Sequence, residues 1–142
     1  MREILFRGKR LNGGEWVEGS LLKVTLDGET WYLIFGDDFI RYGTGISAMQ
    51  HAAVDPKTIG QFTGPTDKNG KKVFEGDICQ TKGKPLIDEK PFVVVWNDYY
   101  SGFYWENLDN PRETDMFTET VADLTEVIGN IHDNPELLEV GE

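Results

Sequence analysis

The chain has few of the side chains from which catalytic and metal sites are usually built. Its 142 residues include one cysteine, Cys79, and two histidines, His51 and His132. A single cysteine excludes an intramolecular disulfide, and this set of ligands cannot easily supply the convergent N and S atoms of a zinc site. Cys79 also follows Ile78 in an expected strand, where cysteine is typical of a small core residue. We therefore predict a protein that is not an enzyme, with no catalytic residue, no metal and no cofactor.

Long hydrophobic runs are absent as well. No apolar run approaches the roughly 18 residues that a membrane-spanning helix requires. Residues 1–7 contain charged side chains and lack the apolar segment of a signal peptide. These absences predict a soluble cytoplasmic protein with no membrane contact, with a location in the virion as the alternative.

Basic residues are scarce in the last third of the chain. Residues 98–142 contain twelve acidic side chains and one basic side chain, Arg112, whereas the two signs balance in residues 1–97. The formal net charge of −11 therefore arises at the C-terminal end. A surface of this sign repels phosphate backbones, which makes nucleic acid an unlikely partner. Solubility is the simplest interpretation, and a basic partner or mimicry of nucleic-acid charge are the alternatives.

Turn residues are plentiful. Glycine and asparagine recur every eight to twelve residues or so, and long stretches with helical periodicity are missing, which predicts a mainly β fold. A chain of this length forms a single domain over residues 1–142, with the alternative of two β subdomains, 1–54 and 55–142. Strands are expected at residues 2–8, 16–22, 30–35, 59–63, 71–74, 77–82, 90–97, 103–108 and 125–131.

One short helix is predicted at the C-terminal end. Asp133 or Asn134 can cap it, and Pro135 suits the first helical position. Residues 39–54 show no clean period and are interpreted as a loop that crosses between subdomains. Residues 118–124 fit either a helical turn or a poor strand.

The densest aromatic cluster surrounds a predicted hairpin tip. Six aromatic side chains lie between Trp96 and Trp105, enough to stack bases or sugars or to anchor an interface. Trp96 and two of the three aromatics at 103–105 are predicted to face the core, with Tyr99 and Tyr100 exposed at the tip. Because no basic residue lies nearby, we predict a protein interface formed by Tyr99, Tyr100 and Trp105.

The segment "TIGQFTGPTDKNGKKVFEGDIC", residues 58–79, is rich in turns. Asn69 and Gly70 predict a type I′ hairpin, in which both central residues have positive φ. Glu75 and Gly76 predict a bulge or diverging turn, in which Asp77 could accept backbone N–H bonds. We interpret the segment as structural, with a ligand site as the alternative. The predicted structural turn residues are Gly60, Gly64, Asn69, Gly70, Glu75, Gly76 and Asp77.

This segment resembles the YopX family of phage and prophage proteins. Three landmarks occur in order: the opening "MREILFRGK" followed by "EWVEGSLL", the middle pattern "VDPKTIGQFTGPTDKNGKKVFEGDI", and the closing "EVIGNIHDNPELL". Pro65 departs from the aliphatic residue expected at its position. The resemblance implies a mainly β fold of coiled sheets, with an SH3-like barrel in the part built on the turn at residues 75–77. It also implies a phage or prophage origin, hence a bacterial cytoplasm, and it implies no activity, cofactor or catalytic residue.

The leading functional hypothesis is an accessory or assembly protein that acts by contact with an unknown phage or host protein. A homo-oligomer is also expected, because short strands leave sheet edges to be paired or covered. The alternative is a phage protein that bears on nucleic acid, through a local basic surface or as an acidic mimic. A third class, a carboxylate-dependent hydrolase, requires acids clustered in a cleft. The basic residues that could meet the acidic C-terminal third of a neighbouring copy are Arg2, Arg7, Lys9 and Arg10.

Overall fold

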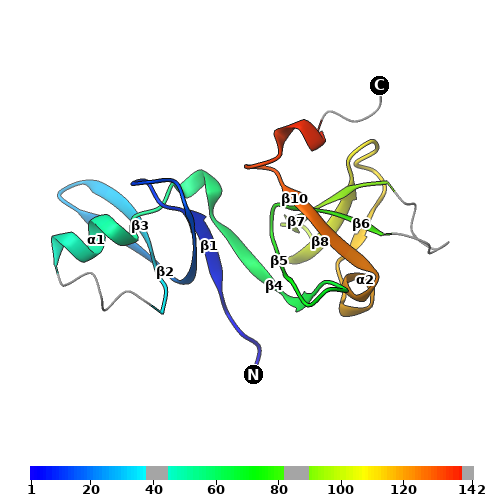
Figure 1. Ribbon diagram of the computed structural model, residues 1–142, viewed down its shortest axis with the longest axis horizontal. Helices are drawn as coiled ribbons and strands as arrows, with labels where there is room; N and C mark the ends of the chain where they lie inside the picture. Colours follow the sequence, from blue (N-terminus) through cyan, green and yellow to red (C-terminus); the bar gives the residue numbers. More distant parts are fainter. Residues whose placement is uncertain (38–44, 82–89, 139–142) are drawn as a thin grey trace. The chain divides into compact units, whose positions relative to one another are not determined.

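Figure 1 shows the chain in a computed structural model, which describes residues 1–37, 45–81 and 90–138. The chain divides into two compact units, Met1–Phe62 and Thr63–Glu142. Strands form two antiparallel sheets, in the orders β3-β2-β1-β4-β5 and β10-β6-β7-β8-β9, so the predicted mainly β fold is confirmed. The strands are β1 (Phe6–Lys9), β2 (Trp16–Leu26), β3 (Glu29–Phe35), β4 (Gly60–Thr66), β5 (Lys72–Phe74), β6 (Asp77–Thr81), β7 (Phe92–Asn97), β8 (Gly102–Asn107), β9 (Thr114–Met116) and β10 (Thr125–Asn130). The helices are α1 (Ile46–Ala52) and α2 (Glu119–Asp123), with the 3-10 helices η2 (Pro56–Thr58) and η3 (Pro135–Leu138).

In the first unit, β2 changes partner part-way along its length. Its first residues, up to Gly19, pair with β1, and the residues from Ser20 onward pair with β3. A Cβ atom at Gly19 would overlap the backbone carbonyl of Phe35 at the end of β3. The strand can therefore pass from one partner to the other only because this position carries no side chain.

The β2–β3 hairpin of the first unit is covered on both faces. Leu33 and Ile34 are neighbours on β3, so their side chains point to opposite faces of the sheet. Ile34 packs in a cluster with Val17 and Val54. Leu33 packs with Ala52 at the end of α1 in a second cluster. This small unit is thus organised as a hairpin with an apolar layer on each side.

The second unit has its core under β6 and β7. The side chains of Cys79, Phe92 and Val94 are at most 1% exposed and pack together. Val121 and Ala122 of α2 close the cluster from the other side. The predicted core position of Cys79 is confirmed.

The helices differ from the prediction. The single C-terminal helix is wrong in kind and in number, because residues 135–138 form a 3-10 helix and two α-helices lie elsewhere. Asn134 turns back toward β10, where its Oδ1 accepts a hydrogen bond from Asn130 N (3.1 Å). The crossing loop expected over residues 39–54 contains α1 instead, which forms because Ala52 and Met49 pack against β3. Residues 38–44 lie outside the described part of the chain. At residues 118–124 the structure has the helical alternative, α2.

The turn at Asn69 and Gly70 also differs from the prediction. Gly70 has a φ of 82°, whereas Asn69 is not among the non-glycine residues with positive φ, so the turn is not type I′. The side chain of Asp67 accepts from the backbone N–H groups of Asn69 and Lys71, both at 2.9 Å, and holds a longer loop. The type I′ pattern occurs instead between β2 and β3, where both central residues have positive φ.

Neither sheet closes into a barrel among the described strands, so the fold consists of two open antiparallel sheets. Within the same residues, no helix has the length and apolar character needed to cross a membrane.

Candidate functional site

The β7–β8 hairpin carries the aromatic cluster. The β-branched residues Val93, Val94 and Val95 favour an extended strand, and β8 returns antiparallel to it from Gly102. Asn97 Oδ1 accepts the backbone N–H of Tyr100 (2.9 Å), which ties the four-residue loop to the end of β7. The tip is therefore a defined turn held by its own side chain.

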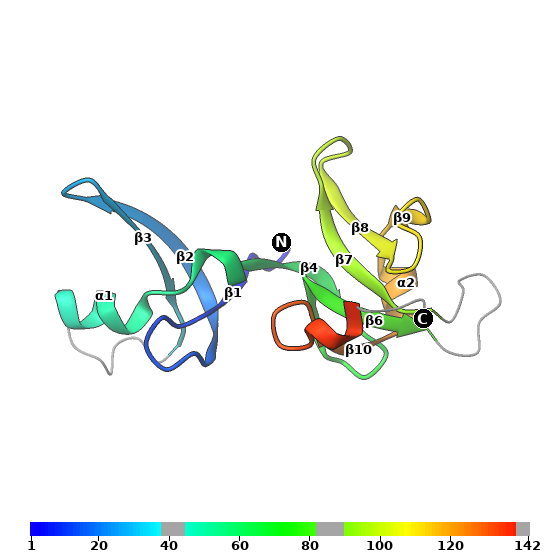
Figure 2. The ribbon, with the colours of Figure 1, turned by 90° about the horizontal axis from the view of Figure 1, so that it is seen from above.

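The exposed aromatic side chains gather at this tip. Figure 2 shows β7 and β8 extending side by side to the turn that joins them. Tyr99 is 86% exposed and Tyr100 is 63% exposed. The ring of Tyr100 stacks on Tyr104 with centroids 5.3 Å apart, and Tyr99 meets Tyr100 edge-on at 4.8 Å. We call Trp96, Tyr99, Tyr100 and Tyr104 the aromatic tip.

Trp96 belongs to this exposed set, and its predicted core position is wrong. It is 44% exposed and meets Phe103 edge-on across the hairpin, with centroids 5.2 Å apart. The side chain of Trp96 points to the same face of the sheet as those of Phe92 and Val94. Trp96 lies further along β7, however, beyond the end of the core. Its distance from the core, rather than the face to which it points, therefore decides how exposed Trp96 is.

Trp105 lies apart from the aromatic tip. It stands opposite Val94, packs against the core and has its ring centroid 5.9 Å from that of Phe92. It also lines a hollow of about 300 Å³ between β8, β9 and α2. The structure thus brings together Tyr99 and Tyr100 of the predicted interface and separates Trp105 from them.

The surroundings of the aromatic tip are acidic. Residues 91–111 contain no lysine or arginine, whereas Asp98 lies beside the tyrosines. Burial, followed by the nearby Tyr100 and Asp115, raises the pKa of Tyr104. The hydroxyl group of Tyr104 therefore stays protonated and neutral at physiological pH. The aromatic tip is an apolar surface with carboxylates beside it.

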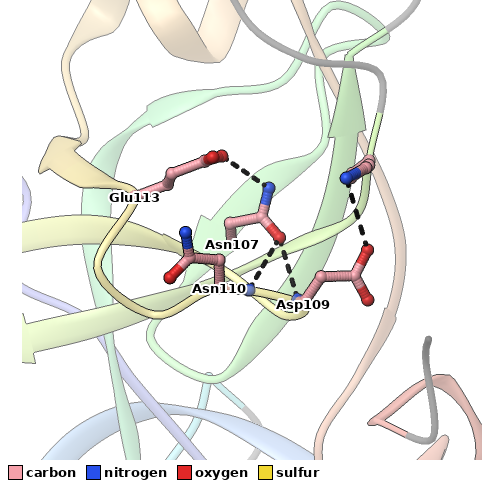
Figure 3. A network of polar contacts seen from close by, with 5 residues as sticks. Asn107, Asp109, Asn110 and Glu113 are labelled. Carbon is pink, nitrogen blue, oxygen red and sulfur yellow. Dashed lines mark hydrogen bonds and ion pairs between the residues drawn. The ribbon is translucent and has the colours of Figure 1, made fainter.

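A network of polar contacts fixes the other end of the hairpin (Figure 3). Asn107 Oδ1 accepts from the backbone N–H groups of Asp109 (2.8 Å) and Asn110 (3.3 Å). Asn107 Nδ2 donates to a carboxylate oxygen of Glu113 (3.1 Å). These bonds hold the loop between β8 and β9, and they give the network a structural role.

The predicted turn residues lie in two loops and in the strands β4 and β6. Gly64, Gly70 and Gly76 have φ values of 113°, 82° and 92°, the region that favours glycine. Gly60 begins β4 in extended conformation opposite Arg7. Asn69 lies in the β4–β5 loop, Glu75 lies in the β5–β6 turn, and Asp77 begins β6.

Two carboxylates anchor these turns. Asp77 Oδ2 accepts the backbone N–H of Phe74 (2.8 Å) across the β5–β6 turn. Asp67 Oδ2 accepts the backbone N–H of Val127 on β10 (3.0 Å) in addition to its two bonds within the loop. Burial on its own raises the pKa of Asp67, but the hydrogen bonds from Val127, Lys71 and Asn69 lower it below the usual value.

No three His, Cys, Asp or Glu side chains in residues 1–37, 45–81 and 90–138 are placed to hold a metal ion. Cys79 is fully buried in β6, and His51 lies on α1.

The segments that carry the family landmarks contact one another in the second unit. Ile131 N donates to the carbonyl oxygen of Gly76 (3.0 Å), so the closing motif binds the turn of the middle motif. The family model described as "YopX protein" matches residues 5–139. The chain belongs to the YopX family. The match extends over both units and nearly the whole chain.

A solved structure is similar to the chain over its full length. The structure titled "Crystal structure of protein EF1440 from Enterococcus faecalis" is 26% identical to this YopX-family chain, with a TM-score of 0.55. The similarity covers 98% of this chain and 100% of the other. No curated protein matches the chain.

Proposed function

We propose that this YopX-family protein is a phage- or prophage-encoded accessory or assembly protein that acts by protein–protein contact through its aromatic tip. The exposure of Tyr99 and Tyr100 on a defined hairpin turn is the observation that carries the proposal. Tyrosine and tryptophan are enriched in the energetically dominant parts of interfaces, because they bury a large rigid area. The acidic surroundings favour a partner with a basic and apolar surface.

Replacement of the two tip tyrosines tests this function. For Tyr99→Ala/Tyr100→Ala we expect at least about 2 kcal/mol of lost binding energy, or roughly thirtyfold weaker affinity, because central aromatic residues dominate interfaces. The partner is first recovered by pull-down from an induced lysogen with tagged wild-type protein. Its affinity for both forms is then measured by biolayer interferometry.

Leu138→Ala is the matched control, because Leu138 is a 43% exposed apolar side chain of the same unit that lies in η3, outside the β7–β8 hairpin. This variant is expected to bind as the wild type does. Equal binding by the double tyrosine variant would reject the aromatic tip as the contact surface, provided that its thermal unfolding is unchanged.

A second candidate function is binding to nucleic acid by the first unit. Arg7 and Lys9 lie over the ring of Trp16, at 4.7 Å and 5.5 Å from the centroid, which gives a local basic and aromatic surface. Arg7 is only 9% exposed, which favours a structural contact over a phosphate contact. A target recovered in the pull-down only when nuclease is omitted would favour this second function.

We also propose that the protein self-associates through the aromatic tip. The alternative, pairing of basic and acidic patches, is weakened because Arg10 binds Glu15 (3.0 Å) and Arg7 is largely buried. We therefore expect an oligomer by size exclusion with light scattering that persists at high salt, since burial of aromatic area is not screened by ions. Tyr99→Ala/Tyr100→Ala should dissociate it. A 16.1 kDa monomer at high protein concentration in both low and high salt contradicts the proposal.

The SH3-like barrel implied by the family resemblance is a structural proposal for the second unit. Lys68 N donates to Thr125 O (2.9 Å), and Asp67 binds Val127 N, so the β4–β5 loop is bonded to β10. These bonds connect the end of the first sheet, at β4 and β5, to β10 at the edge of the second sheet, as a barrel would require. An experimental structure that includes residues 82–89 tests the closure.

A further inference from the structure

The outer edge of β3 is paired over only part of its length. β2 pairs with one edge of the strand, and Ala53 forms an isolated bridge with Leu33 on the other edge. Val54 N donates to the carbonyl oxygen of Tyr32 (2.9 Å). The chain then leaves β3, because Asp55 N donates to Lys9 O and Pro56 begins η2. The stretch of β3 from Glu29 to Trp31 continues beyond this pairing.

The backbone of Thr30 points toward that outer edge. In a strand, the N–H and C=O groups of alternate residues point to the same edge. The carbonyl of Tyr32 points to the outer edge, because it accepts from Val54 there, so both backbone groups of Thr30 do the same. Among the described residues, neither group has a hydrogen-bond partner. The N–H and C=O groups of Thr30 can therefore form a pair of hydrogen bonds with one residue of an added strand.

Two hollows flank this stretch of edge. The edge hollow, of about 380 Å³, lies between β3 and the departing segment, so an added backbone would enter it. The helix hollow, of about 250 Å³, lies between α1 and the β2–β3 turn. The edge hollow is lined by Leu11, Glu29, Thr30, Trp31, Tyr32, Ala53, Val54 and Pro56. The helix hollow is lined by Leu26, Asp27, Glu29, Trp31, Ile46, Met49 and Gln50.

The arrangement of the hollows suits a strand. Successive side chains of a strand point to opposite faces, so one residue of an added strand can fill the helix hollow while its neighbours stay over the other face. Trp31 lines both hollows and supplies an aromatic wall to each. Leu26 and Ile46, at 49% and 73% exposure, extend the apolar surface of the helix hollow.

The charge of the lining identifies the partner further. Glu29 lines both hollows, Asp27 lines one of them, and the described lining residues include no lysine or arginine. Carboxylates at the rim of an apolar groove favour a segment with lysine or arginine next to its apolar side chains.

We propose that the outer edge of β3, from Glu29 to Trp31, binds an extended segment of a partner protein by strand addition. The segment hydrogen-bonds to Thr30, places an apolar side chain in the helix hollow and sets a basic side chain beside Glu29. In strand addition, main-chain bonds supply affinity and the pockets for alternate side chains supply specificity. This surface is in the first unit and is separate from the aromatic tip, so the proposal goes beyond the proposed function.

The test uses the full chain and a fluorescein-labelled, amidated probe peptide of sequence Lys-Val-Leu-Val-Lys, with fluorescence anisotropy as the measurement. Thr30→Pro removes the outward N–H and leaves the bonds to β2, because the proline nitrogen faces the outer edge. We expect this variant to bind the probe at least about tenfold more weakly than wild type, since the added strand loses a main-chain bond and meets the proline ring. Thr30→Val, which keeps the N–H, is the matched control and should bind as wild type does.

Two further probes keep the test decisive if Thr30→Pro unfolds. A peptide N-methylated at its central leucine cannot donate to Thr30 O and should lose affinity to a similar extent. A peptide with glutamate in place of both lysines should bind more weakly to wild type, and Glu29→Lys should reverse that preference. Equal affinity for the methylated and unmethylated peptides overturns strand addition. Binding of no peptide, or pairing of β3 edges between two copies that Thr30→Pro abolishes, overturns the proposal of a foreign segment.

Discussion

Asp67→Ala is expected to lower the free energy of unfolding by about 4 kcal/mol, the largest effect of any single substitution considered for this protein. The carboxylate is 4% exposed and accepts three backbone N–H groups, from Asn69, Lys71 and Val127. Alanine leaves all three without this acceptor, and Val127 lies on β10 beside a shift of strand register, where no neighbouring strand can replace it. Urea unfolding followed by circular dichroism measures the change.

Asp67→Asn keeps the shape of the side chain and removes its charge, so it measures what the charge contributes to stability. Its amide oxygen can still accept the two bonds of the loop, but its NH₂ group then faces Val127 N–H, so we expect an intermediate loss of about 2 kcal/mol. The pKa of Asp67 is lowered in the folded state. Its contribution to stability is therefore complete above the unfolded pKa of about 3.9 and is lost as the pH falls through the folded value. The stability difference between wild type and Asp67→Asn should be constant from about pH 5 to 8 and shrink below about pH 4.

Asp98→Ala is the control for Asp67, because Asp98 is an exposed acid of the same unit. Its effect is expected to stay within about 0.5 kcal/mol. An Asp67→Ala protein as stable as Asp98→Ala would contradict the view that this carboxylate joins the β4–β5 loop to β10.

Gly19→Ala is expected to destabilise the protein by about 3 kcal/mol and to lower the melting temperature by roughly 10 °C. The added methyl group would overlap the carbonyl carbon and oxygen of Phe35. These are backbone atoms of a paired strand, so the overlap can be relieved only by separation of β2 from β3. Thermal unfolding by differential scanning calorimetry measures the loss.

Gly102→Ala is the matched control for Gly19. A Cβ atom at Gly102 would meet its nearest neighbours at 3.9 and 4.0 Å, which is ordinary contact. This variant should unfold within a few degrees of wild type. Similar melting temperatures for the two alanine variants would show that β2 does not need a glycine where it changes partner.

Local patterns predicted those parts of the fold that depend on neighbouring residues. The valines of β7 and the aromatic return strand gave the β7–β8 hairpin, and the sequence around Ile78 gave a buried strand with Cys79 in the core. The exposure of Tyr99 and Tyr100 followed from their position at the turn. In each case the strand period or the turn chemistry decides the structure without distant contacts.

Features that depend on distant residues were not predictable in the same way. The loop at Asn69 follows Asp67, whose carboxylate is fixed by Val127, 60 residues further along the chain. α1 has too few residues for a clear helical period and owes its stability to packing on β3. The hollows beside Trp31 could not be found from one strand, because segments from three parts of the first unit line them. The exposed leucines and isoleucine at their rims are recognised only once the structure shows their exposure.

The position of β4 has a consequence for how the chain can be divided into fragments. The boundary between the two units falls between Phe62 and Thr63, inside β4, rather than in a linker. Phe62 N is bonded to Leu5 O on one side of the boundary, and Thr63 Oγ1 donates to Val73 O on the other. A truncation at this junction would therefore divide one strand that is hydrogen-bonded within both units. Each fragment would lose part of the sheet to which β4 belongs.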